Sequence, residues 1–109
     1  MYESILTSIK KMLGIESYYT HFDPDLIMYI NSVFSILAQM GVGPSEGYSI
    51  TGSTETWDDY IEDLSTLQLV KTYIYMKTRL MFDPPTSTSI SEIYKIQIAE
   101  LEWRLSTLV

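Results

Sequence analysis

The chain contains one histidine, His21, the side chain best suited to acid–base catalysis or metal binding near neutral pH. A metal or catalytic site needs further ligands, or a second group that orients the imidazole. The surrounding segment YYTHFDPD has no other histidine and no cysteine, and its carboxylates, Asp23 and Asp25, lie where a helix is expected to begin. We therefore expect His21 to be a structural or solvated residue.

An acidic run without an internal basic residue comprises Glu55, Asp58, Asp59, Glu62 and Asp63. On one helix, Asp58 and Glu62 would lie four residues apart, as would Asp59 and Asp63, and their like charges would repel mildly. The run lacks the turn glycine and the alternating ligands of a calcium loop. We predict a solvated acidic face. The functional alternative is a contact with a basic partner, or a surface that keeps DNA away.

The remaining patterns that could support chemistry are incomplete. The segment Gly41-x-Gly43 is followed by Pro44 and not by the Lys-Ser/Thr pair of a phosphate-binding loop. The chain has no cysteine, which excludes disulfides, thiolate metal sites and cysteine nucleophiles. We therefore predict no catalytic residue, no metal and no cofactor, and we do not expect an enzyme.

Length and composition predict one globular domain spanning residues 1–109. Hydrophobic residues make up 46% of the chain, which is typical of a folded protein. We expect an intracellular protein without membrane association, because no apolar run reaches the roughly 20 residues that cross a bilayer and MYESILTSIKK does not resemble a signal peptide. Seven basic residues against fourteen acidic ones give a net charge of −7, which argues against sequence-specific nucleic-acid binding.

Helical spacing of apolar residues dominates the sequence. Gly14 and Gly41 are expected to end the first two helices, and Pro84-Pro85 to end the third long one. The predicted helices cover residues 2–13, 24–40, a short segment from residue 57, 66–82 and 89–105.

Polar residues at the expected helix starts predict N-caps. Asp23 precedes Pro24 and is expected to cap the second helix, while Thr56 is expected to cap the short one. Ser89 and Glu92 have the spacing of a capping box for the last helix.

The segment between the second helix and the short helix holds four of the five glycines and a weakly alternating stretch at residues 48–51. We therefore predict an all-α fold, a small bundle of four to five helices with a short extended or β-hairpin-like insertion between the second and the third.

The segment 66–82 carries two apolar stripes and only a narrow polar strip, which indicates a helix buried on several sides. We predict that one copy of the chain cannot cover it, and that exposed apolar surface remains around Leu69, Tyr73 and Met76. The predicted subunit interface is Leu69, Tyr73, Met76, Leu80, Trp57 and Trp103.

Several stretches, in this order, resemble the head-to-tail connector (adaptor) proteins of long-tailed bacteriophages. They are ILTSIKKMLGI, DPDLIMYINSVFSILAQMGVGP, TWDDYI, VKTYIYMKTRLMFDPP and ELEWRL, and together they run from Ile5 to about Leu105. No single stretch is diagnostic, since each has a plain structural reason, and the resemblance lies in the ordered set.

The resemblance implies a structural subunit of the virion neck, made in the host cytoplasm. Such subunits form a ring, usually dodecameric, between the capsid portal and the stopper or tail-completion protein, and DNA only passes through it. The resemblance implies no catalysis. It also implies that the glycine-rich loop faces the channel or a neighbouring subunit, through Gly43, Gly47, Tyr48, Ile50 and Gly52. In such proteins the C-terminal segment tends to contact the portal. Because this sequence stops at Val109, soon after the last helix, we expect a short or absent portal-binding tail.

A different class of function remains as the alternative. A small acidic regulator or DNA mimic would bind a basic host or phage protein through carboxylates spaced like phosphates. The acids here cluster between Glu55 and Asp63, which counts against that reading.

Overall fold

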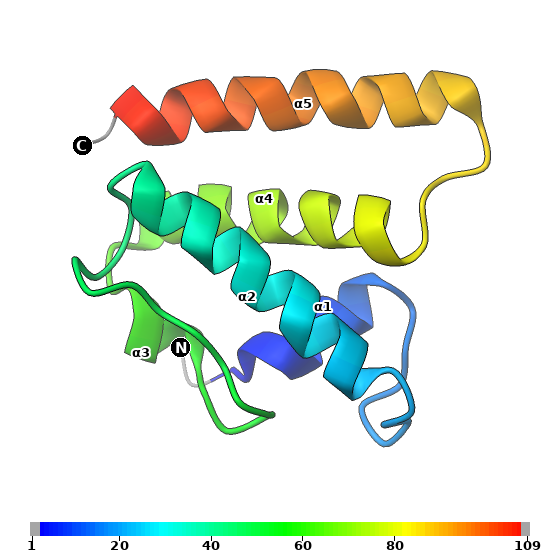
Figure 1. The fold of residues 1–109 in the computed structure, drawn as a ribbon, viewed down its shortest axis with the longest axis horizontal. Coiled ribbons are helices and arrows are strands. Elements are labelled where there is room, and N and C mark those ends of the chain that lie inside the picture. The colour runs from blue at the N-terminus through cyan, green and yellow to red at the C-terminus, as the bar shows by residue number, and fades with distance from the viewer. Residues whose placement is uncertain (1–2, 108–109) are drawn as a thin grey trace.

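The computed structural model describes residues 3–107. Over that range the regular secondary structure consists of helices. Figure 1 shows α4 in the middle of the fold, with α5 stacked along one side of it and with α1 and α2 on the other. The predicted all-α bundle is therefore confirmed. The helices are α1 (Ile5–Met12), α2 (Asp23–Gln39), α3 (Trp57–Tyr60), α4 (Leu64–Phe82) and α5 (Thr88–Thr107).

The hydrophobic core lies between α2 and α4, and α1 packs against both. Apolar residues three and four positions apart fall on one face of each helix, and these faces meet. Burying each such side chain contributes about 1.5–3 kcal/mol relative to leaving it in water. The buried stripe of α2 is Leu26, Ile30, Val33, Phe34 and Leu37, and that of α4 is Leu67, Val70 and Ile74.

The predicted helix ends agree with the structure where glycine or proline sets them. Gly14 and Gly41 follow α1 and α2 with φ angles of +82° and +87°, a left-handed conformation that glycine adopts without a Cβ clash. Helix α4 ends at Phe82, just before Pro84-Pro85, and the turn leads directly into α5. Helices α4 and α5 therefore form a helical hairpin.

Two predicted N-caps are wrong. Helix α5 begins before Ser89, and the Ile90 N–H donates to Ser87 Oγ over 3.4 Å, so Ser87 is the capping residue. Asp23 does not precede α2 but is its first residue, and its carboxylate pairs with Lys10 at 2.9 Å. The Asp23 carboxylate pairs with Lys10 and does not cap the helix, because a buried charge without a partner costs more free energy than an uncapped helix N–H.

Lys10 is a buried cation inside the fold, only 2% exposed. Its Nζ contacts Asp23 Oδ1 at 2.9 Å and donates to the backbone carbonyl of Ser17 at 3.1 Å. These bonds fasten the connection between α1 and α2, and they satisfy the ammonium group.

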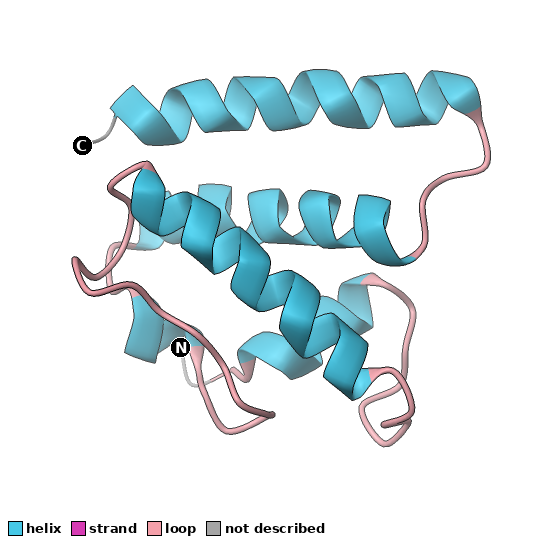
Figure 2. Cartoon of the chain, viewed as in Figure 1, coloured by secondary structure: helices cyan, strands magenta, loops and turns pink. Residues whose placement is uncertain are grey.

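The predicted hairpin-like insertion is not formed. Figure 2 shows a long loop between α2 and α3. The β pairing within residues 3–107 is a single isolated antiparallel bridge between Ser4 and Thr56. The Asn31 side chain holds this loop, accepting from the Ile50 N–H at 2.7 Å and donating to the Ile50 carbonyl at 2.9 Å. A side-chain amide of α2 thus takes the place of the partner strand.

Candidate functional site

The α4–α5 contact is the simplest interface in the fold, since α5 packs mainly on α4. Ile98, Leu101 and Leu105 supply its buried apolar side. The Tyr73 hydroxyl donates to Glu102 Oε2 over 2.7 Å. Burial, together with this hydrogen bond and the charge of Glu102, raises the pKa of Tyr73 well above its usual range. The phenol therefore stays protonated and remains a donor near neutral pH.

A second polar cluster joins the hairpin nearer its turn. Arg79 Nη1 donates to the hydroxyls of Tyr75 and Tyr94 at 3.2 and 3.1 Å, and its guanidinium lies 5.6 Å from the centre of the Tyr94 ring. Burial alone would raise the pKa of Tyr75, but hydrogen bonds from Tyr94 and Arg79 lower it. Burial and the bond to Tyr75 raise the pKa of Tyr94. These contacts position α5 against α4, and they engage all three side chains in hydrogen bonds with one another.

The six residues predicted at a subunit interface lie in different environments. Trp57 and Tyr73 are fully buried by their own chain, so they offer no surface to a second subunit, and their assignment is corrected. The expected exposed surface around Tyr73 is absent because α5 covers that side of α4. Leu69, Met76 and Leu80 are partly buried, whereas Trp103 is 65% exposed on α5; their contact with a neighbour stays a prediction.

The predicted loop residues are also divided. Ile50 is buried, so its predicted position facing a channel or a neighbour is corrected. Tyr48 is half-buried against Phe34 and Tyr60, with ring centres 5.2 and 5.3 Å apart, and burial followed by the charge of Asp59 raises its pKa. The side chains of Ile50 and Tyr48 thus anchor the loop to the core. Gly43 is exposed, and Gly47 and Gly52 are partly exposed, so these glycines share the solvent side of the loop with polar residues such as Ser45 and Glu46.

The acidic run does not form one helical face. Helix α3 ends at Tyr60, so the predicted four-residue pairs do not share a helix, and that prediction is wrong. The Thr56 N–H donates to Asp59 Oδ2 at 3.0 Å, and Asp63 is the N-cap of α4. These carboxylates accept hydrogen bonds from nearby backbone, which accounts for their position in the sequence.

Glu55 closes the turn before α3. Its carboxylate accepts from the N–H and the hydroxyl of Thr51, at 2.9 and 2.8 Å, and from the Gly52 N–H. Although burial works in the opposite direction, these bonds lower the pKa of Glu55. Bonds from Thr66 likewise lower the pKa of Asp63. The exposed acids on this side are Asp59, Glu62 and Asp63, and Asp58 is partly buried.

His21 lies among aromatic rings. Its ring centre is 4.9 Å from that of Phe22 in an edge-on arrangement, and Tyr19 is 6.2 Å away. Across residues 3–107, no three histidine or carboxylate side chains are grouped to hold a metal ion. His21 is exposed to solvent and packs against the rings of Phe22 and Tyr19.

Residues Gly43 to Gly47 have the G-x-S-x-G spacing of a hydrolase nucleophile, with Ser45 at its centre. That motif requires a strand before the serine and a helix directly after it. Here the segment follows α2 and is part of the long loop that precedes α3. The surroundings of Ser45 are not those of an activated serine.

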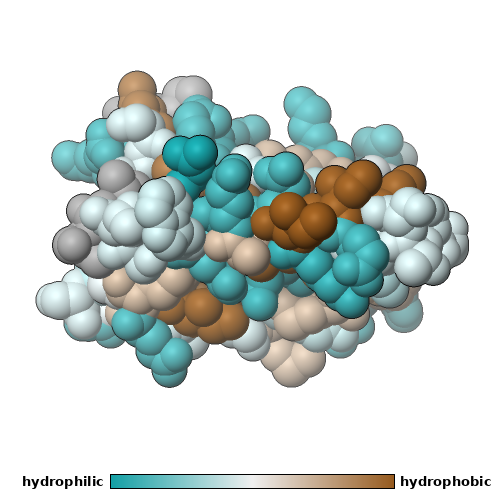
Figure 3. Space-filling view, turned by 90° about the horizontal axis from the view of Figure 1, so that it is seen from above, coloured by the Kyte–Doolittle hydropathy of each residue, from teal (hydrophilic) through white to brown (hydrophobic). Residues whose placement is uncertain are grey.

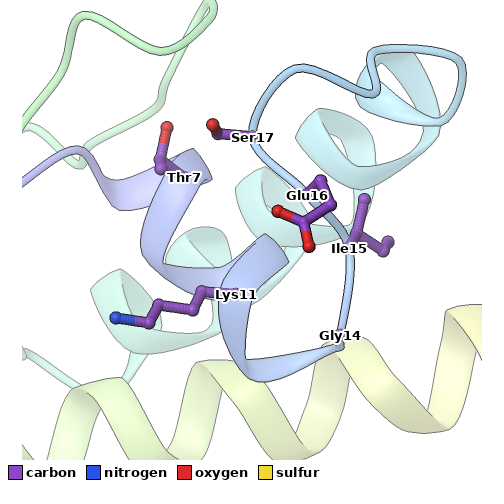
Figure 4. A pocket seen from close by; sticks show the side chains of 6 residues that line it. All are labelled: Thr7, Lys11, Gly14, Ile15, Glu16 and Ser17. Carbon is purple, nitrogen blue, oxygen red and sulfur yellow. The ribbon is translucent and has the colours of Figure 1, made fainter.

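One open depression of about 360 Å³ lies beside the end of α1. Figure 4 shows that the Lys11 side chain extends away from Glu16, so the two charges do not converge on a common point. Sites for small molecules usually enclose most of the ligand and aim a few polar groups at it. This depression does neither. Its lining residues are Thr7, Lys11, Gly14, Ile15, Glu16 and Ser17.

More large apolar side chains are exposed on α5 than on any other described helix. Ile90, Ile93, Ile96 and Trp103 all project into solvent. Sequence analysis identified Trp103 alone, because helical spacing shows that α5 has apolar residues on two sides but not which side another helix covers.

The sequence model of one protein family, described as phage connector protein, matches residues 5–108. No curated protein and no solved structure matches the chain. No helix within residues 3–107 is both long and apolar enough to cross a membrane.

Proposed function

The chain belongs to the phage connector protein family, and from that premise we propose that it is one subunit of a ring that joins the capsid portal to the tail and lines the passage for DNA. The single observation that carries this proposal is the extent of the family match, residues 5–108 of 109.

Surface chemistry supports assembly as the work of this chain. Ile93, Ile96 and Trp103 are large apolar side chains left in water on one helix. Contiguous exposed apolar surface is typical of protein contact sites. A subunit that functions by packing against other subunits requires such a surface.

The charge of the chain supports a passive conduit. Binding to a DNA backbone is driven by lysines and arginines that release counterions. A net charge of −7 gives the opposite tendency, and the acids Asp59, Glu62 and Asp63 are exposed. A duplex sliding past such a subunit would find little to hold it.

The proposed partners are other copies of this chain in a dodecameric ring, the portal protein, and a stopper or tail-completion protein. The proposed location is the virion neck, after assembly in the host cytoplasm. We propose no reaction for the chain, because the family description is that of a structural connector.

The alternative of an acidic regulator or DNA mimic has weaker support. Glu55, Asp59 and Asp63 each accept a hydrogen bond from the backbone N–H of a residue three or four positions away, so local structure explains their presence. A phosphate-like array of carboxylates would need a different arrangement.

Deletion of the gene from its phage, followed by electron microscopy of the particles, tests the proposal. We expect DNA-packaging capsids without attached tails, and attached tails when the gene is supplied in trans. Mass spectrometry of purified virions should detect the chain. Normal tailed particles after deletion, or virions that lack the chain, would overturn the proposal.

A further inference from the structure

Helix α5 has two apolar sides, and its own chain covers only one of them. Ile98 and Leu105 face α4 and are buried, whereas Ile96 is 66% exposed and Trp103 65% exposed. Each residue turns an α-helix by about 100°, so Ile96 lies roughly opposite Ile98. Seven residues make nearly two turns, which places Trp103 on the same side as Ile96.

The outer face of α5 is defined as Ile93, Ile96, Ala99 and Trp103, which lie on one side of the helix. Ile93 lies one turn before Ile96, and Ala99 lies on the turn that separates Ile96 from Trp103 and is itself exposed. Figure 3, seen from the side on which α5 lies, shows separate hydrophobic patches among polar side chains there.

The size of this face suits the centre of a protein interface. Two isoleucines and a tryptophan that are more than half exposed leave roughly 400 Å² of side-chain surface in water along this face. A standard interface takes about 800 Å² from each partner. The outer face of α5 is thus about half of one side of such an interface, with an exposed tryptophan of the kind that often dominates binding.

Charges on α5 favour a second copy of this chain over a basic partner. Glu92 lies 3.6 Å from Lys95, and Glu100 lies 3.7 Å from Arg104, so these acids are already beside cations. The remaining acid, Glu102, accepts from Tyr73.

The net charge of α5 follows from these residues. Three acids and two bases give −1 for residues 88–107, against −7 for the whole chain, so −6 lies elsewhere. Two copies that meet through α5 therefore oppose little net charge.

We propose that the outer face of α5 is the surface through which one copy of this chain binds another. The inference rests on the proposed function, since it names the contact by which the ring subunits associate. It differs from the sequence-based interface in that Trp57 and Tyr73 are buried by their own chain, and only Trp103 of the six predicted residues belongs to the outer face of α5.

The test is sedimentation velocity of the purified chain over a concentration series. We expect concentration-dependent association of the wild type. Ile96→Glu and Trp103→Glu should each weaken the association constant by about tenfold or more, because either change places a charge in a desolvated contact. The matched control is Leu64→Glu, since Leu64 is 61% exposed at the first residue of α4, away from the outer face of α5.

Circular dichroism should give the same helix content and melting temperature for all three variants, because each position is exposed. Association that is equal in Ile96→Glu and the wild type would overturn the inference, and so would a wild type that stays monomeric over the whole series. Both results leave the connector role standing, because that role is decided by tail attachment and virion content.

Discussion

The Trp57 indole donates a hydrogen bond from Nε1 to Ser8 Oγ over 2.8 Å, although 49 residues separate them in the sequence. Ser8 Oγ in turn donates to the Ile5 carbonyl over 3.0 Å. All of these atoms are buried. The relay joins α3 to α1, and it explains why a tryptophan in a four-residue helix belongs to the core and not to a surface.

The first prediction concerns that relay. Ser8→Ala should lower the free energy of unfolding by about 1–3 kcal/mol, because it leaves a buried indole N–H without an acceptor. Urea denaturation followed by tryptophan fluorescence measures the change. Ser32→Ala is the control, since the Ser32 hydroxyl is exposed on α2, and it should stay within about 0.5 kcal/mol of wild type. Equal effects of the two variants would show that the relay contributes nothing specific.

Two glycines separate a backbone effect from a packing effect. Gly43 and Gly47 have φ angles of +87° and +85°, but only at Gly43 would an added Cβ meet a side chain, 2.7 Å from Tyr60 Cε1. Gly47→Ala should cost about 1 kcal/mol for the left-handed conformation. Gly43→Ala should cost about 1–3 kcal/mol more, because the Tyr60 ring must move. Thermal melts of both variants provide the comparison, and equal melting temperatures would refute the close contact.

The third prediction tests the buried ion pair. Lys10→Met retains the aliphatic stem but removes the charge that faces Asp23, leaving that carboxylate, 23% exposed, without its partner. We expect a loss of about 1–3 kcal/mol in the free energy of unfolding. The double variant Lys10→Met with Asp23→Asn should recover part of that loss. If the double variant is the less stable of the two, the two residues are not coupled as described.

Alkaline pH should destabilise the fold through two tyrosines. Burial raises the pKa of Tyr60 to about 12, and burial with the Glu102 bond raises that of Tyr73 further. The unfolded chain releases these protons first, so the stability present below the usual tyrosine pKa of about 10 is lost as pH rises from there through the folded values. Melting temperatures between these limits should fall less steeply for Tyr60→Phe than for wild type. Parallel curves would contradict the burial of this phenol.

Acid should act through Glu55. Its pKa is lowered in the folded state, so its contribution is present above the unfolded pKa and is lost as pH falls through the folded value. Glu55→Gln should therefore be less stable than wild type near neutral pH, and the difference should shrink on acidification. Glu62→Gln is the comparison, since Glu62 is exposed and follows α3. Chemical denaturation at several pH values measures both variants, and a pH-independent difference would argue against this role.

Local sequence alone predicted the helices and several of their ends. Apolar spacing predicted α2 as a helix and showed that α4 is apolar on two sides, because 3.6 residues per turn fix which side chains share a side. It did not show that the side with Tyr73 is covered by the chain itself. Gly14, Gly41 and Pro84 marked helix ends for reasons that belong to their own backbone. The ordered set of these elements was also enough to suggest the family.

Only the tertiary structure decided what each face meets. Tyr73 is buried because α5 folds back over it, and Ile50 is buried because Asn31, 19 residues earlier, holds its backbone. Asp23 serves Lys10 because the turn between α1 and α2 brings the charges together. The spacing within one helix sets which residues point the same way. Whether they point at water, at the chain itself or at another copy depends on the packing of segments far apart in sequence, which leaves Ile96 and Trp103 outside.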